Sequence, residues 1–425
     1  MLGLVYVTLS LARPFAGYKY VGKLYTHAHA TNRINAIRFQ ELDMSPAVDG
    51  GDPFRGMRKN VSEIEIVADM ACTITRPGPI IPQWYPLRAF LWRGTTLWRI
   101  VPLEILTNMF VAAAISCILQ GVRFNGLTLS APAFVTSLLP AVDRVWAITA
   151  GLASFTLSFF LSQAYAFWRT IYSSTRQVQG RLNDIGLMCA TGATRGSDGR
   201  YTPEAVEMLE DLARLVRLFN IMLYASVTTR FAPLRTSRGL RALESRGAIT
   251  ADESEALLTS RTFHSAVLEW IVLLFNSAMA DGRLCNSASG GEKVPLGNGF
   301  REQVLNLRAV SASIEDGLSG RMPLAYVQLV QVMTDILVGL TPLALIHSVG
   351  GIGAMLGTGI TTLFYSSTVV LAKMLLDPFD NDSYGGGGGI SINVATLIQE
   401  TNVGSERWLK GAEWAPPISL PQRGR

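Results

Sequence analysis

Two phenylalanines in an uncharged stretch are the residues best placed to act on a solute. Phe155 and Phe159 are four positions apart in Val145–Phe167, which contains no charged residue, so on a helix they share one face with Gly151 one turn above. Polar side chains flank this face: Ser158, Ser162 and Gln163. Aromatic rings around a narrow lumen present positive ring edges to a passing anion, and a hydrophobic constriction gates by dewetting. The alternative is that both rings only pack against neighbouring helices.

No other residue pattern predicts chemistry. The sequence contains no nucleophile–base pair, phosphate loop, dinucleotide fingerprint or zinc-protease motif, so we expect no enzyme and no cofactor. Gly385–Gly389 lacks the Lys-Ser/Thr of a phosphate loop and is typical of a linker. Any function must therefore come from the way helices assemble. A single helix encloses no path, whereas a symmetric ring of copies does.

The composition indicates a membrane protein. Hydrophobic residues make up 49% of the chain and charged residues only 16%, compared with roughly 25% charged residues in soluble domains. The mean hydropathy is +0.27. The net charge of +5 suits anions or an anionic membrane face, and it does not indicate nucleic acid.

Apolar runs predict four membrane spans: Val101–Leu119, Val145–Phe167, Pro323–Val349 and Ile352–Leu376. Gly350-Gly351 is expected to form the turn between the last two, and Pro132 and Pro140 to break the apolar segment Leu127–Val142. Asp335 lies within the third span, so we expect it to face the interior of the bundle. Its expected partners are Glu104 and Asn108 of the first span, or an arginine near the membrane face.

Residues 169–261 are polar, rich in arginine and periodic at helical spacing, which predicts an extramembrane helical body. One apolar stripe consists of Leu209, Leu212, Leu215, Val216 and Phe219. Phe263–Met279 is either a buried helix or a partial membrane dip. After the linker, Ile390, Ile392 and Val394 are expected to form an extended strip on this body.

The expected organisation is an all-α, multi-pass membrane protein. An N-terminal extension, residues 1–83, has no acid before Glu41 and is either a targeting segment or an amphipathic helix on the membrane face. The remaining predicted parts are a first membrane hairpin with the pore-lining helix (84–168), a mainly extramembrane helical body (169–322), a second membrane hairpin (323–376) and a C-terminal tail packed on that body (377–425).

Two motifs that bracket the apolar region resemble a known family. Trp92-Arg93-Gly94-Thr95 precedes the first span, and Leu376-Asp377-Pro378-Phe379-Asp380 follows the last. Together with Phe155-Thr156-Leu157-Ser158-Phe159-Phe160, they resemble the bestrophin family of anion channels. Further similar stretches are Arg217-Leu218-Phe219-Asn220, Leu243–Leu257 and Met322-Pro323-Leu324-Ala325-Tyr326, so that the resemblance covers residues 84–400.

The resemblance implies a homo-oligomer, pentameric in the family, that conducts chloride or bicarbonate through a central hydrophobic neck. Carried over, Phe155 and Phe159 are the lower neck positions, and the upper one falls on Gly151, where the family has a bulky residue and Ile148 or Leu152 would fill the gap. A second constriction would fall at Val294, Pro295 and Leu296.

The acids after the last span are sparser than the calcium clasp of animal bestrophins. Asp377 and Asp382 are the candidate calcium ligands, but calcium needs six to eight oxygens, so we expect conduction without it. The sparse acids resemble the bacterial, plant and algal branch, including thylakoid chloride channels and algal bestrophin-like proteins. A plastid thylakoid is one expected location, with a plasma or inner membrane as the alternative. The other functional interpretation is a non-conducting membrane scaffold whose basic helical body binds a partner.

Overall fold

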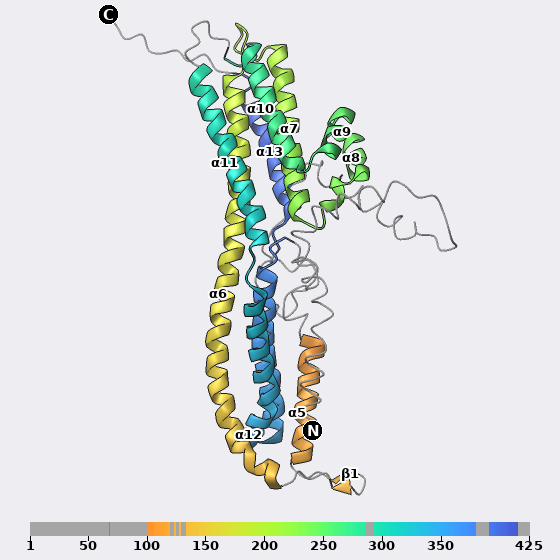
Figure 1. Ribbon diagram of the computed structural model, residues 1–425, viewed down its shortest axis with the longest axis vertical. Coiled ribbons are helices and arrows are strands. Elements are labelled where there is room, and N and C mark those ends of the chain that lie inside the picture. Colours follow the sequence, from red (N-terminus) through yellow and green to blue (C-terminus); the bar gives the residue numbers. More distant parts are fainter. Residues whose placement is uncertain are drawn as a thin grey trace, which may run out of the picture. The chain divides into compact units, whose positions relative to one another are not determined.

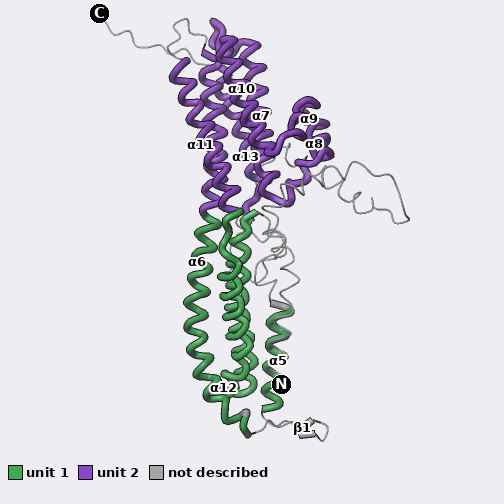
Figure 2. The backbone as a smooth tube through the Cα atoms, in the orientation of Figure 1, with its two compact units in different colours: residues 1–50, 81–169, 319–391 green, residues 51–80, 170–318, 392–425 purple. Residues whose placement is uncertain are grey.

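The computed structural model describes residues 68, 101–119, 123–124, 127–128, 133–285, 293–379 and 391–414. Most of these residues are helical (Figure 1), and the predicted all-α fold is confirmed. The chain divides into two compact units (Figure 2). Of the described residues, those within 101–169 and 319–391 belong to the first unit, and those within 170–318 and 392–414 belong to the second.

The first unit contains the apolar helices of the two predicted membrane hairpins. A π-helical turn, η2 (Val101–Ile105), leads into α5 (Leu106–Leu119), which packs along α12 (Leu324–Leu375). Two-residue strands β1 (Arg123–Phe124) and β2 (Leu127–Thr128) pair antiparallel between α5 and α6 (Ala133–Gly192). Among the described helices, α6, α12 and α10 (Phe263–Ala280) are long and apolar enough to cross a membrane.

Helix α12 is two antiparallel limbs joined at Gly350. This residue has φ 76° and ψ 179°, a backbone conformation that glycine adopts without a Cβ clash. Each limb holds about 25 residues and rises about 38 Å, which is enough to cross a hydrocarbon core of about 30 Å. The predicted turn at Gly350 is therefore confirmed.

Helix α6 differs from its prediction at both ends. The expected break at Pro140 is wrong, because α6 begins at Ala133 and continues through this proline. The helix also continues beyond the apolar run to Gly192, so that residues 133–169 lie in the first unit and residues 170–192 in the second. The end of an apolar run marks the change from lipid to water. A helix can continue across that change, because its backbone hydrogen bonds are made within the helix.

The second unit is built around α7 (Pro203–Val227), which packs against α10 and α13 (Val394–Gly411). Thr202 caps α7, and Pro203 follows at a position where its missing N–H costs nothing. The remaining elements are η3 (Ala232–Arg235), α8 (Ser237–Glu244), α9 (Ala251–Thr259) and α11 (Lys293–Ser319). The whole predicted apolar stripe of α7 is buried.

Two segments left open or misread from the sequence take definite form in this unit. Helix α10 packs along α7 and buries Val267, Ile271 and Phe275, which favours the buried-helix interpretation. The expected extended strip is wrong from Val394 onward, since this residue begins α13 and is buried there. Ile392 is also buried, and Ile390 lies outside the described residues.

Candidate pore face and its supports

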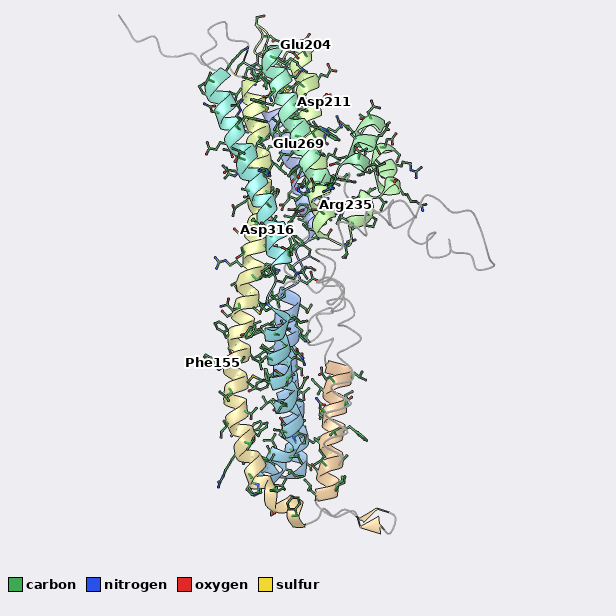
Figure 3. All side chains as sticks on the ribbon, viewed as in Figure 1. Phe155, Glu204, Asp211, Arg235, Glu269 and Asp316 are labelled. Atoms are coloured by element: carbon green, nitrogen blue, oxygen red, sulfur yellow. The ribbon has the colours of Figure 1, made fainter. Side chains whose placement is uncertain are left out.

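The predicted neck residues lie on the exposed face of α6. Phe155 is 76% exposed and Phe159 is 52% exposed. Figure 3 shows Phe155 on the side of α6 that faces away from α12. A Cβ built on Gly151 would meet no atom within 4 Å, so this position is open as well.

The opposite face of α6 packs against α12. Leu157, Phe160 and Ala164 form one core cluster with apolar residues of both limbs of α12: Val330, Val369, Ala372 and Leu375. The Phe160 ring meets the edge of the Tyr326 ring with centroids 5.6 Å apart. This packing fixes the rotation of α6 and thereby the direction of Phe155 and Phe159.

Five large apolar side chains form a continuous exposed seam on α6. They are Val145, Ile148, Leu152, Phe155 and Phe159, at alternating spacings of three and four residues. This is the spacing of a coiled-coil contact line. Ile148 is seven residues before Phe155, which places it two helical turns toward the N-terminus on the same line, and it is 68% exposed. Of the two expected substitutes for a bulky residue at Gly151, Ile148 is the better aligned, while Leu152 flanks the line.

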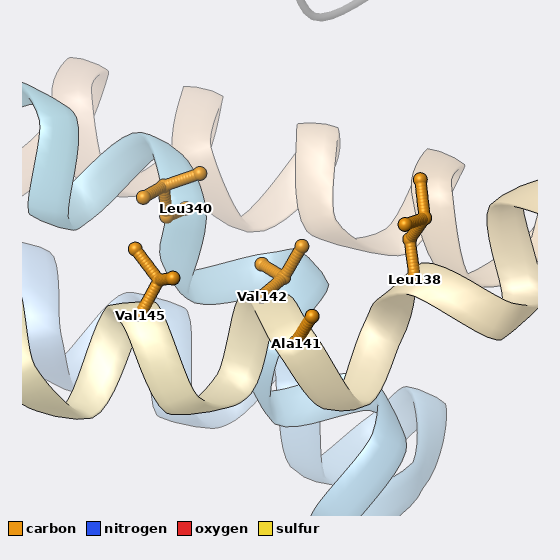
Figure 4. A pocket seen from close by; sticks show the side chains of 5 residues that line it. All are labelled: Leu138, Ala141, Val142, Val145 and Leu340. Carbon is orange, nitrogen blue, oxygen red and sulfur yellow. The ribbon is translucent and has the colours of Figure 1, made fainter.

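A shallow apolar hollow of about 200 Å³ lies beside the N-terminal end of this seam, at Val145 (Figure 4). Its lining is aliphatic throughout, with residues from α6 and the first limb of α12: Leu138, Ala141, Val142, Val145 and Leu340. Because none of these side chains can hydrogen-bond, the hollow offers no binding site for an ion.

Asp335 has the polar surroundings expected of a carboxylate within a membrane span. Its Oδ1 accepts a hydrogen bond of 2.6 Å from Gln331 Nε2, and Gln331 Oε1 accepts one of 2.6 Å from Lys373 Nζ. Lys373 also interacts electrostatically with both Asp335 and Glu104. The interior orientation is confirmed. The amide of Asn108, one of the partners that the sequence offered, donates a hydrogen bond of 3.2 Å to Thr362 Oγ1.

Asp377, the first candidate calcium ligand, forms an ion pair with Arg321. Its Oδ1 lies 3.6 Å from Nη2 of Arg321, so the pair joins the chain just before α12 to the chain just after it. Asp382, the second candidate, lies outside the described residues. Within the described segments, no three His, Cys, Asp or Glu side chains are grouped as a metal site would require. The arrangement of Asp377 therefore closes the helical hairpin.

The predicted second constriction lies on the first turn of α11, in the second unit. Val294 is 66% exposed and Pro295 is also exposed. Leu296 points elsewhere: a Cβ on Gly192 would lie 2.9 Å from its Cδ2, so this leucine packs on the end of α6. Only the first two residues are open to a path or to another copy.

Sequence reasoning missed the two polar connections that fasten the hairpin of α12. Lys373 and Gln331 are 42 positions apart, and Arg321 and Asp377 are 56 apart. The available signal was the turn at Gly350, because folding the helix back there brings residues at similar distances on either side to within about one helical turn of each other. Gln331 and Lys373 are 19 and 23 residues from Gly350, respectively.

No protein-family model and no curated protein matches the sequence. Solved structures do match. A bacterial bestrophin homologue from Klebsiella pneumoniae with a single substitution superimposes with a TM-score of 0.55 at 12% identity, over 73% of this chain and 98% of that chain. A second variant of it gives 0.53 at 14% identity, over 73% and 99%. A third gives 0.51 at 15% identity, over 72% and 98%. The chain therefore has the bestrophin fold.

Proposed function

We propose that this chain assembles into a homo-oligomeric anion channel whose neck is lined by the exposed seam of α6. The observation that carries the proposal is the division of this helix into two faces. One face is packed against α12, and the other presents Ile148, Phe155 and Phe159 without any cover from the described part of the same chain.

Cyclic symmetry turns such a seam into a lumen. A ring of identical helices, each with one packed and one open face, encloses a path lined by the open faces. Five copies are proposed on the resemblance to bestrophins. Lipid would cover the seam equally well on an isolated helix, so the proposal depends on α6 facing the axis of the ring.

The chemistry of this lining suits small anions. A phenyl ring has a negative face and a positive edge, so rings that turn their edges to the lumen attract an anion weakly. Weak attraction lets an ion leave as readily as it enters. The constriction formed by these apolar side chains can lose its water and so close the path. Chloride and bicarbonate are the proposed permeant ions. Val294 and Pro295 of α11 are the proposed second constriction.

The experiment is ion flux through the purified chain in liposomes. We expect chloride efflux and bicarbonate-driven changes of internal pH, with little flux of potassium. An intact oligomer that passes neither anion would contradict the proposal and would favour the alternative, a non-conducting scaffold. Size-exclusion chromatography with light scattering on the same sample gives the number of copies.

A further inference from the structure

Two arginines bound the uncharged stretch of α6 that holds the proposed neck. Arg144 directly precedes Val145–Phe167, and Arg169 follows this stretch by two residues. Both arginines belong to the first unit, and both are exposed. Within the described part of the chain, neither guanidinium has a hydrogen-bond or ion-pair partner. The two charges are therefore available to a ligand.

The helical register places both arginines on the same face as the neck residues. At about 100° per residue, Arg144 lies about 20° around the helix axis from Phe155, which follows it by eleven residues. Arg169 comes fourteen residues after Phe155 and lies about 40° from it, on the same side as Arg144. One line along α6 therefore passes from the first arginine, over the phenyl rings, to the second.

The burial of the intervening residues agrees with this register. The residues that follow the line between the two arginines are all exposed: Ile148, Gly151, Phe155, Ser162 and Ala166. The residues that lie about 140–200° away from Phe155 are instead buried in the cluster with α12: Leu157, Phe160 and Ala164. The open face of the helix thus continues without interruption from Arg144 to Arg169.

The separation of the two arginines suits the two ends of a membrane path. They are 25 residues apart, a rise of about 38 Å along the helix. A hydrocarbon core is about 30 Å thick, and about 40–45 Å with the headgroup regions. When the apolar stretch between them spans that core, each arginine lies just outside it, on either side of Phe155 and Phe159.

No acid of this helix opposes the two charges on the open face. Asp143 is the single acid from Ala133 to Arg169. It is half-buried, and it lies about 100° around the axis from Arg144. The open face is therefore positive at both ends and apolar between them.

We propose that Arg144 and Arg169 form two rings of positive charge, one at each end of the neck, which bind the permeant anion before it enters. The inference rests on the proposed function, because such rings exist only if α6 faces the axis of a homo-oligomer. Charges of one sign in a recess with low-dielectric walls raise the local concentration of counter-ions roughly tenfold to a thousandfold. The rings thus supply anions to a neck that attracts them only weakly, and they repel cations.

The test is the unitary conductance of the full-length channel in chloride solutions of about 0.01 M and about 1 M, where the Debye length is about 30 Å and about 3 Å. Arg144→Gln with Arg169→Gln should lower the conductance about tenfold in the dilute solution, because the local excess of anions is lost. In the concentrated solution the same variant should conduct nearly like the wild type. Arg144→Lys with Arg169→Lys keeps the charges and should keep most of the conductance.

The single variants give the sharper result. Arg144→Gln should lower the current of anions that enter from its own end of the neck, and Arg169→Gln the current of anions that enter from the other end. The two variants should therefore rectify in opposite directions in the dilute solution. A substitution that only loosens the packing of α6 would not produce this reversal.

The matched control removes the same charge from another helix. Arg238→Gln with Arg241→Gln changes two exposed arginines of α8 and should conduct like the wild type in both solutions. The inference is overturned if the Arg144/Arg169 glutamine variant keeps its conductance in dilute salt, if both single variants rectify in the same direction, or if the control loses as much conductance. The first result would assign the two arginines to lipid headgroups. A wild-type chain that passes no anion would instead contradict the proposed function, and the inference with it.

Discussion

Helices α6 and α7 are both rich in apolar side chains and use them in opposite ways. Ten of the eleven residues from Leu215 to Ala225 on α7 are buried, including the polar Asn220. On α6, Phe155 and Ile148 are more than half exposed, while the other face of the helix is packed. A helix that is buried all round is complete within its own unit. The described part of the first unit therefore leaves apolar surface open to lipid, to other copies or to a lumen.

The largest expected difference comes from truncating one phenylalanine in each helix. Phe219 is 0% exposed and Phe155 is 76% exposed. Phe219→Ala should lower the free energy of unfolding by about 3–5 kcal/mol, because it leaves a cavity. Phe155→Ala should lower it by less than about 0.5 kcal/mol. Thermal unfolding of both variants in the same detergent measures the difference, and equal losses would break the comparison between the two units.

The next effect concerns the charges inside the first unit. Lys373→Met leaves the Asp335 carboxylate without its cation, and we expect a loss of about 3 kcal/mol with poorer recovery of the oligomer. Adding Asp335→Asn should restore most of this loss, because the charge that needed compensation is gone. Asp335→Asn alone should leave assembly and anion flux nearly unchanged. A change in ion selectivity in that single variant would instead place the carboxylate on the conduction path.

In the second unit, a smaller effect is expected from a partly buried ion pair. Arg214 donates hydrogen bonds of 2.7 and 3.0 Å to the two carboxylate oxygens of Glu253. Burial alone would raise the pKa of Glu253, but these bonds and those from Thr250 outweigh it and hold the pKa below its usual value. The stabilisation is therefore complete above the ordinary glutamate pKa of 4.5 and is lost as the pH falls through the lower, folded-state value.

Glu253→Gln should cost about 1–3 kcal/mol at neutral pH and should flatten the loss of stability below pH 4.5. Glu255→Gln, on the same helix but exposed, is the control and should do neither. Denaturant unfolding at pH 7 and at pH 4 distinguishes the two variants. A Glu255 variant that behaves like the Glu253 variant would show that overall charge, rather than the pair, sets the acid sensitivity.

The smallest effect should be that of calcium removal. Asp377 is paired with Arg321, and the described residues contain no group of three His, Cys, Asp or Glu side chains that could hold a metal ion, whereas calcium takes six to eight oxygens. Anion flux should therefore be the same in chelator and in micromolar calcium. A channel that opens only with calcium, and that Asp382→Ala silences, would contradict this expectation.

Whether a feature of this molecule can be predicted from the sequence depends on how far apart in the chain the interacting residues lie. The turn at Gly350 and the buried stripe of α7 were predictable, because both depend on residues close together in the chain. The start of α13 was missed although Asn393 caps it by accepting a hydrogen bond from Thr396 N, since an isolated cap signal after a glycine run is weak. The bond from Lys373 to Gln331 depends on packing between two limbs, which no local pattern encodes.

The pore residues illustrate the same limit. Spacing places Phe155 and Phe159 on one face, but it does not tell whether that face is packed. The cluster of Leu157, Phe160 and Ala164 against α12 decides this point, because it occupies the other side of the helix. The choice between a lumen and lipid for the open side depends on contacts between copies.

Unitary conductance of the Phe155→Ala, Phe159→Ala double variant tests the central claim most directly. The matched control is Phe110→Ala with Phe364→Ala, which removes two phenyl rings that are 75% and 65% exposed on α5 and α12. If α6 lines the neck, the first variant should show a larger unitary current or loss of gating, and the control should conduct like the wild-type channel. Unchanged conductance and gating in the Phe155/Phe159 variant, with the oligomer intact, would contradict the account.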